Sequence, residues 1–154
     1  MTMIEVVLGV AVAAVIVGVS MPLVKGTTKF LHLKAAVPAV SGIIVSTKYQ
    51  AVMYGCPYQV AFSQTTTSYQ VSQQVLSGSP PTCAASFTNV GSATPWSSSG
   101  DVSISASITL QFNPNGTISN ITSPSTVPAT FSLTNGTQTE TFTISGVGNV
   151  SVSP

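Results

Sequence analysis

Few side chains in this sequence are of the types that catalyse reactions or bind metal ions. Its 154 residues include four Lys, no Arg, three acids and one His. That histidine, His32, lies between two leucines, with no second histidine and no acid in the same segment. Asp101 and Glu140 are the acids after Glu5, and no His after His32 could orient a serine nucleophile beside them. The sequence therefore predicts that the protein is not an enzyme: it has no catalytic residue, no metal-ligand set and no cofactor.

The two cysteines, Cys56 and Cys83, are spaced too widely for a C-x-x-C redox motif. Disulfides persist outside the cytoplasm, which is where the apolar N-terminal segment described below would hold the rest of the chain. Closing a loop of about 28 residues stabilises a fold by roughly 3 to 4 kcal/mol. We therefore predict a structural disulfide between Cys56 and Cys83.

Glu5 is the one charged side chain among the first 24 residues. An ionised carboxylate in an apolar segment costs about 2.5 to 3.5 kcal/mol on insertion into a membrane, so we expect it to have a partner. With no cationic side chain in this stretch, that partner is the α-amino group of Met1, either of the same chain or of a neighbouring copy. Pairing within the chain spans one helical turn. Pairing with a staggered neighbour would set the register of stacked subunits.

Four sequons, at Asn115, Asn120, Asn135 and Asn149, fit N-glycosylation. Two of them, Asn115-Gly116 and Asn135-Gly136, are also hairpin-turn signals. Sugars linked to hydroxyl groups are an equal alternative in a chain so rich in Ser and Thr. The four asparagines therefore stand as candidate glycosylation sites.

After Lys48 the sequence has no Lys or Arg and a formal charge of minus two. Binding to a phosphate backbone is driven by cationic side chains that release counterions, so the sequence excludes nucleic acid as a partner. The single tryptophan, Trp96, could stack on a ligand. The favoured interpretation is that Trp96 pins a long loop to the core.

The composition combines 44% hydrophobic residues with only 5% charged residues, against about 25% charged in an average soluble domain. So much apolar content predicts a buried core and excludes intrinsic disorder. The chain also contains 23 Ser and 20 Thr. Its surface is therefore expected to be hydrated by hydroxyl and amide groups and to respond weakly to salt.

Residues 1–24 form a hydrophobic segment, apolar without a break from residue 6 to residue 19. Twenty-four helical residues rise about 36 Å, enough to cross a hydrocarbon core of about 30 Å. A signal peptide is the alternative, but the segment lacks a basic start and an A-x-A-like cleavage site. The lysines follow the apolar run, so we expect a short basic leader upstream of Met1 to have been removed.

Residues 25–55 continue as the amphipathic half of the same helix, with an apolar stripe at spacings of three, four and seven. The predicted stripe comprises Phe30, Leu33, Val37, Val40, Ile44, Ala51 and Tyr54. Pro22 and Pro38 each remove a backbone donor, so kinks or a locally unwound turn are expected there. Gly55, followed by Pro57, ends the helix.

Residues 56–154 change to a period of two, which is typical of strands. Alternation predicts strands around residues 58–62, 69–71, 102–104, 108–112, 131–133, 142–144 and 150–152, with a long surface loop over residues 76–100. The predicted fold class is α+β: a long N-terminal helix packed on an antiparallel β-sheet head domain with one hydrated face.

The N-terminal sequence MTMIEVVLGVAVAAVIVGVSMPLV resembles the mature start of a type IV pilin, in its hydrophobic first residue, Thr2, Glu5, long apolar helix and Pro22. The family usually starts with Phe, so Met1 is a departure. The remainder resembles the pseudopilin and minor-pilin branch with a GspH/FimT-type head. The matching segments are KYQAVMYGCPYQVAF, ITLQFNPNGTIS and TFTISGVGNVSVS.

The resemblance implies a precursor in the inner membrane, cleaved before Met1 by a prepilin peptidase. Pilus assembly machinery then extrudes it as a homopolymer held together by the N-terminal helix. Met1 would carry an N-methylated amine, Glu5 would accept a neighbour's amine, and the helix from Gly18 to Pro22 would unwind in the fibre. The expected product is a major subunit of a cell-surface filament for adhesion or motility. The alternatives are a minor pilin, a type II secretion pseudopilin, or a monomeric membrane-anchored binding module.

Overall fold

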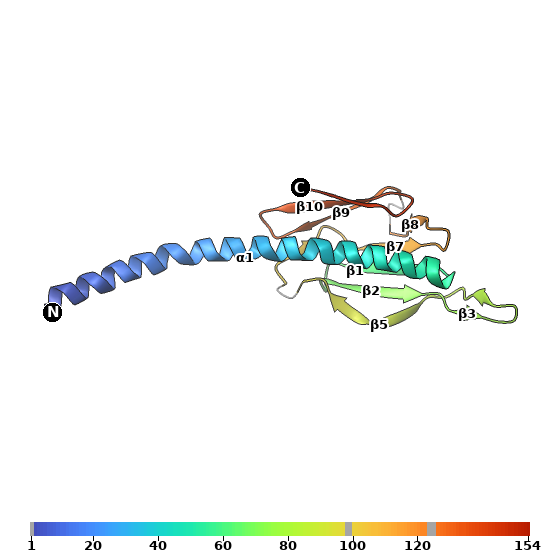
Figure 1. Cartoon of the computed structure of the whole chain (residues 1–154), viewed down its shortest axis with the longest axis horizontal. Helices are drawn as coiled ribbons and strands as arrows, with labels where there is room; N and C mark the ends of the chain where they lie inside the picture. The colour runs from blue at the N-terminus through green and yellow to red at the C-terminus, as the bar shows by residue number, and fades with distance from the viewer. Residues whose placement is uncertain (1, 98–99, 123–125) are drawn as a thin grey trace.

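One long helix, α1 (Met3–Tyr54), has a β-domain packed against its C-terminal half (Figure 1). The computed structural model describes residues 2–97, 100–122 and 126–154, and it describes residues 18–25 by their backbone alone. The 52 residues of α1 correspond to a rod of about 78 Å at 1.5 Å per residue. Its N-terminal half projects beyond the β-domain as a bare rod, as Figure 1 shows. The predicted α+β class is confirmed.

The helix continues through both of its prolines. The backbone of α1 is helical from Met3 to Tyr54, so the expected unwound turn is not found; the rod curves gently instead (Figure 1). Pro38 lies on the exposed side of the helix, where the carbonyl that loses its donor can be hydrated. The helix ends at Gly55, whose φ of 68° is left-handed and whose N–H donates to the Ala51 carbonyl at 3.1 Å.

The C-terminal half of α1 buries one stripe against the β-domain. The buried members are Leu33, Ala36, Val40, Ile44, Thr47 and Ala51. Their spacings of three and four residues are those of a helix face. Phe30 and Tyr54, predicted for this stripe, are exposed because they lie at the two ends of the packed region.

Five antiparallel strands form the sheet that lies under the helix, in the order β5-β2-β1-β7-β8. They are β1 (Tyr58–Ser63), β2 (Ser68–Gln73), β5 (Thr88–Pro95), β7 (Ile108–Phe112) and β8 (Ile118–Asn120). In β1 and β7, buried residues alternate with half-buried ones, which is the signature of a strand with one face in the core. Alternation therefore located both strands in the sequence.

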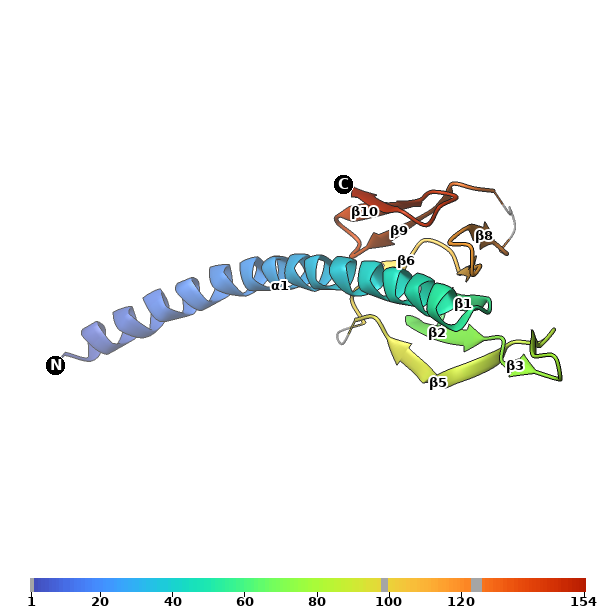
Figure 2. The ribbon, with the colours of Figure 1, turned by 45° about the vertical axis from the view of Figure 1, so that its right-hand side comes forward.

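A second antiparallel sheet has the order β11-β10-β9-β6, so the β-domain has two main sheets where the sequence predicted one. It consists of β6 (Ser103–Ile104), β9 (Ala129–Thr134), β10 (Thr139–Ile144) and β11 (Val150–Ser153). Figure 2 shows β9 and β10 on one side of α1 and β2 and β5 on the other. The β9–β10 and β7–β8 hairpins turn at Gly136 and Gly116, with φ of 88° and 80°. Both expected Asn-Gly turns are therefore present.

The segment from residue 76 to residue 100 is not the long loop that the sequence predicted. It contains the small hairpin β3 (Leu76–Ser77) and β4 (Thr82–Cys83), followed by β5, which pairs along β2. Every residue of β5 is exposed, so this strand has no buried face and no period of two for sequence analysis to detect. Backbone hydrogen bonds to β2 hold it at the edge of the sheet.

The core lies where α1 and the two main sheets meet. Phe62 of β1 stacks on Phe131 of β9 with ring centroids 5.7 Å apart, and Phe131 stacks on Phe142 of β10 at 4.9 Å. Leu33, Val40 and Ile44 complete the cluster from the helix. These contacts make the helix half and the β-domain one packed unit.

Candidate functional site

The N-terminal part of α1 is an apolar surface with nothing packed over it in the single molecule. Every side chain from Met3 to Val17 is exposed. By length and composition, one stretch of the described helix, Gly26–Tyr54, meets the requirement for a membrane span, and Met3–Val17 is a shorter apolar stretch. Gly26–Tyr54 contains the stripe that packs on the β-domain, whereas Met3–Val17 is bare. The bare part is therefore the one able to enter lipid or to pack on other helices.

Glu5 caps the start of its own helix. The Thr2 backbone N–H donates to Glu5 Oε2 at 3.2 Å, and the Glu5 N–H donates to the Thr2 carbonyl at 3.0 Å. This is one arm of a capping box, and T-x-x-E was the sequence signal that could have revealed it. The structure thus gives the carboxylate an uncharged partner within the chain, the Thr2 N–H, where the sequence predicted an amine.

The remaining predicted assembly residues are described only in part. Met1 lies outside the described residues. The backbone at Gly18 and Pro22 is helical, and their side chains are not among those described. Pairing of Glu5 with a neighbour's amine stays a prediction.

Both acids of the β-domain make contacts with α1. Lys34 Nζ lies 2.6 Å from Glu140 Oε1, and the Glu140 side chain is only 9% exposed against 50% for Lys34. His32 Nδ1 lies 3.2 Å from Asp101 Oδ2, and both side chains are partly exposed. In the sequence His32 has no acid near it, because Asp101 is far along the chain. These two contacts, the Lys34–Glu140 ion pair and the His32–Asp101 contact, act as clasps between the helix and the β-domain.

Two further hydrogen bonds reinforce the clasps. Lys48 Nζ donates to the Val147 carbonyl at 2.7 Å, and Asn135 Nδ2 donates to the Lys29 carbonyl at 3.1 Å. Both join α1 to turns beside β10. Polar contacts thus tie the helix to the four-stranded sheet over several turns.

Cys56 and Cys83 are at disulfide distance, with Sγ atoms 2.05 Å apart and Cα atoms 5.6 Å apart. Cys56 lies just after α1, and Cys83 lies in β4. The bond therefore ties the β3–β4 hairpin to the end of the helix.

Burial divides the four candidate glycosylation sites into two pairs. Asn120 and Asn135 are buried, and the Asn135 side chain accepts hydrogen bonds from its own turn while donating to the helix. Asn115 and Asn149 are exposed in turns. Only Asn115 and Asn149 offer an asparagine that a sugar could reach without unfolding the domain.

Trp96 is 5% exposed and packs on Phe62, with ring centroids 6.0 Å apart. Trp96 therefore packs in the core, as the favoured interpretation held, but the segment that leads to it is strand β5 and not a long loop. Among the described residues, no group of three or more His, Cys, Asp or Glu side chains is placed to hold a metal ion.

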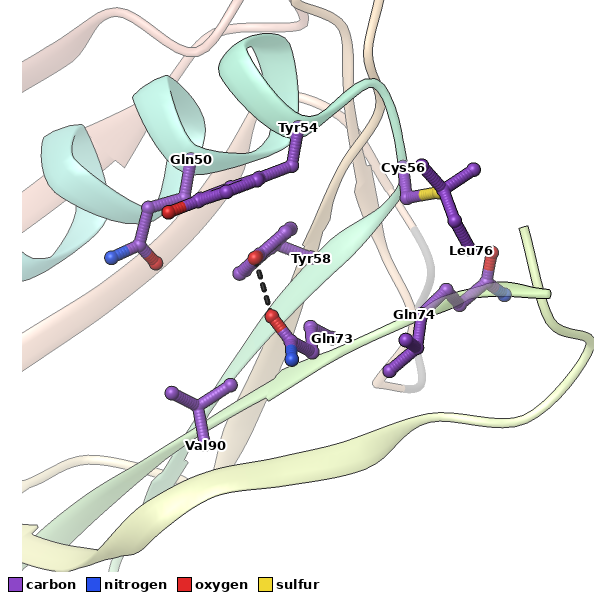
Figure 3. Close-up of a pocket in the computed structure, with 9 residues that line it drawn as sticks. Gln50, Tyr54, Cys56, Tyr58, Gln73, Gln74, Leu76 and Val90 are labelled. Carbon is purple, nitrogen blue, oxygen red and sulfur yellow. Dashed lines mark hydrogen bonds between the residues drawn. The ribbon is translucent and has the colours of Figure 1, made fainter. Parts of the chain in front are cut away.

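An open cleft of about 410 Å³ lies at the end of the β-domain remote from the N-terminus, between the end of α1 and strands β1 to β3 and β5 (Figure 3). Tyr54 of α1 and Tyr58 of β1 stack there with centroids 5.9 Å apart. The Tyr58 hydroxyl donates to Gln73 Oε1. Burial of this phenol, and secondarily the neighbouring Tyr54, raises the pKa of Tyr58 above its ordinary value. Burial therefore favours the neutral phenol of Tyr58.

Comparisons with protein-family models, with curated proteins and with solved structures gave no match.

Proposed function

We propose that this chain is a structural subunit of an extracellular filament of the type IV pilus kind. It would be held first in the inner membrane, processed by a prepilin peptidase and then extruded by assembly machinery. The observation that carries the proposal is the bare apolar rod Met3–Val17, which projects from a folded β-domain and is charged only at Glu5 (Figure 1). Soluble monomers rarely expose a continuous apolar surface of this extent.

In a bundle of such rods, each rod covers the apolar surface of its neighbours, which is exposed in the single molecule. In the membrane, lipid covers Met3–Val17; outside it, equivalent helices of other copies do the same. Side-by-side packing of apolar helices removes their surface from water, a gain of about 25 cal/mol per Å² buried. The β-domains then form the outer surface of the fibre, which has few charges and is rich in hydroxyl groups.

A substitution of Glu5 tests the proposal, because it can keep the hydrogen bond from the Thr2 N–H while removing the charge. Glu5→Gln keeps an oxygen that can accept the Thr2 N–H but removes the charge that would pair with a neighbour's amine. If the charge sets subunit register, cells producing Glu5→Gln should shed about tenfold fewer filaments, as counted by electron microscopy of sheared surface material. Mass spectrometry of the main band would show whether this chain is the principal component.

The matched control is Asp101→Asn, which removes one acid from the β-domain and leaves the rod unchanged. This variant should form filaments at the wild-type level. Normal filaments from Glu5→Gln would contradict a charge-guided polymer. Absence of the wild-type chain from sheared filaments would favour a monomeric membrane-anchored module. Fibres in which the chain is a trace component would favour a minor pilin or a type II secretion pseudopilin.

A further inference from the structure

The cleft beside Tyr54 has no role in the proposed polymer. Its walls come from separate elements: Tyr54 and Gln50 from α1, Tyr58 from β1, and Val90 from β5 (Figure 3). The end of α1 and strand β3, which border the hollow, lie at the opposite end of the molecule from the projecting rod (Figure 1). Packing of the rods through Met3–Val17 therefore does not itself cover the hollow.

Every residue that lines the cleft is uncharged. The nearest cation along the helix, Lys48, is committed to the Val147 carbonyl, and the two acids of the β-domain face other parts of α1. A charged ligand would have no counter-charge here and would lose hydration on entry. The lining therefore selects a neutral ligand.

Aromatic and amide groups converge in the cleft. The Tyr54 ring is 59% exposed and rests on the buried Tyr58, so its orientation is supported from behind. Gln73 uses its Oε1 for the Tyr58 hydroxyl, which leaves its NH₂ group as a donor. The Gln50 side chain has no hydrogen bond within the described residues, so both its donor and its acceptor are available. A flat apolar face flanked by amides matches the C–H face and the hydroxyl rim of a sugar ring.

The cleft extends along the molecule. A second hollow of about 210 Å³ runs between α1 and strands β2 and β5, and it shares Gln50 and Val90 with the first. Its lining adds the hydroxyls of Ser46 and Thr94 and the ring of Tyr69. These two adjacent hollows, together called the trough, favour a ligand of more than one sugar ring by their volumes of about 410 and 210 Å³.

We propose that this trough binds a neutral oligosaccharide. The inference goes beyond the proposed filament and does not depend on it, because binding needs only the folded β-domain and the end of α1. Sugar rings stack on Tyr54, and their hydroxyls bond to the amides of Gln50 and Gln73. Since no ionic contact is involved, affinity is independent of salt.

The test uses saturation-transfer NMR on the full chain in detergent micelles. The probes are cellotetraose, maltotetraose and chitotetraose, with tetragalacturonate as a charged comparison. At least one neutral probe should bind, with equal affinity at about 0.05 M and about 0.5 M NaCl. Tyr54→Ala should weaken that binding about tenfold, and Gln50→Ala should weaken it several-fold.

Tyr49→Ala is the matched control, because Tyr49 is a 68% exposed tyrosine on the same helix outside the cleft. It should bind like the wild type, and all variants should keep the wild-type circular dichroism. Lack of binding by all three neutral probes, preferential binding of tetragalacturonate, or full binding by Tyr54→Ala would overturn the proposal. Loss of filaments in Tyr54→Ala would instead identify the trough as a contact between subunits. Sugar binding retained by Glu5→Gln would separate this site from polymer assembly.

Discussion

At the scale of single residues, the few charged side chains of the molecule hold α1 and the β-domain together. Glu140 and Asp101 are the acids of the β-domain, and both lie against cationic or imidazole groups on α1. Glu140 is nearly buried, so its carboxylate depends on the Lys34 ammonium for a charged partner. The partially exposed His32–Asp101 pair contributes less, because solvent screens it.

Substituting Lys34 tests this dependence. Lys34→Met removes the ammonium and leaves Glu140 buried without that partner, which should lower the free energy of unfolding by about 1 to 3 kcal/mol. Adding Glu140→Gln to Lys34→Met removes the buried carboxylate charge. The double variant should recover part of the lost free energy of unfolding. Urea unfolding of the full chain in detergent, followed by circular dichroism, would measure both values.

Lys29→Met is the control for that experiment. Lys29 also lies on α1, its side chain is exposed, and its hydrogen bond to the β-domain is made by its backbone carbonyl. Unfolding of Lys29→Met should match the wild type. An equal loss in Lys29→Met and Lys34→Met would show that the effect comes from the helix and not from the clasp.

At the scale of elements, the structure separates strands that the sequence reveals from those it hides. β1 and β7 each have a buried face and were predicted; β5 has none and was taken for part of a loop. The short β8 was also missed, because three residues are too few for a period to emerge. Pairing with β2 holds β5 in place, and the local sequence of β5 does not specify that neighbour.

The Cys56–Cys83 bond is the covalent link between elements. It closes a loop over β1, β2 and the β3–β4 hairpin, so removing it enlarges the unfolded ensemble. The double variant Cys56→Ser/Cys83→Ser should lose about 3 to 4 kcal/mol in the free energy of unfolding, measured by urea denaturation without reductant.

Reductant provides the internal control for the disulfide. It should destabilise the wild type to the level of the double variant and leave that variant unchanged. Equal stability of the oxidised wild type and the double variant would mean that the bond is dispensable for the fold.

At the scale of the whole molecule, the chain is a bare rod joined to a self-sufficient packed unit. Among the described side chains the first buried one is Leu33, and those from Met3 to Val17 contribute none to the core. A chain that starts at Gly26 should therefore be monomeric without detergent and keep the β-sheet circular dichroism. Its melting temperature should lie within about 5 °C of that of the full chain in detergent.

Light scattering after size-exclusion chromatography would establish the mass of the shortened chain. The full chain without detergent is the comparison and should form polymers or aggregates. A shortened chain that unfolds would show that the rod contributes to the β-domain after all. One that still polymerises would locate the assembly surface elsewhere.

The sequence by itself determined the features that depend on near neighbours along the chain. An unbroken apolar run, a helical stripe, alternation in β1, β7, β9 and β10, and two Asn-Gly turns are all local patterns, and each predicted its element. The tertiary structure alone decided the division into two sheets, the edge position of β5, the clasps of Asp101 and Glu140 with α1, and the cleft beside Tyr54. Those features join residues far apart in the chain, and they arise only when burial of the shared core brings those residues together.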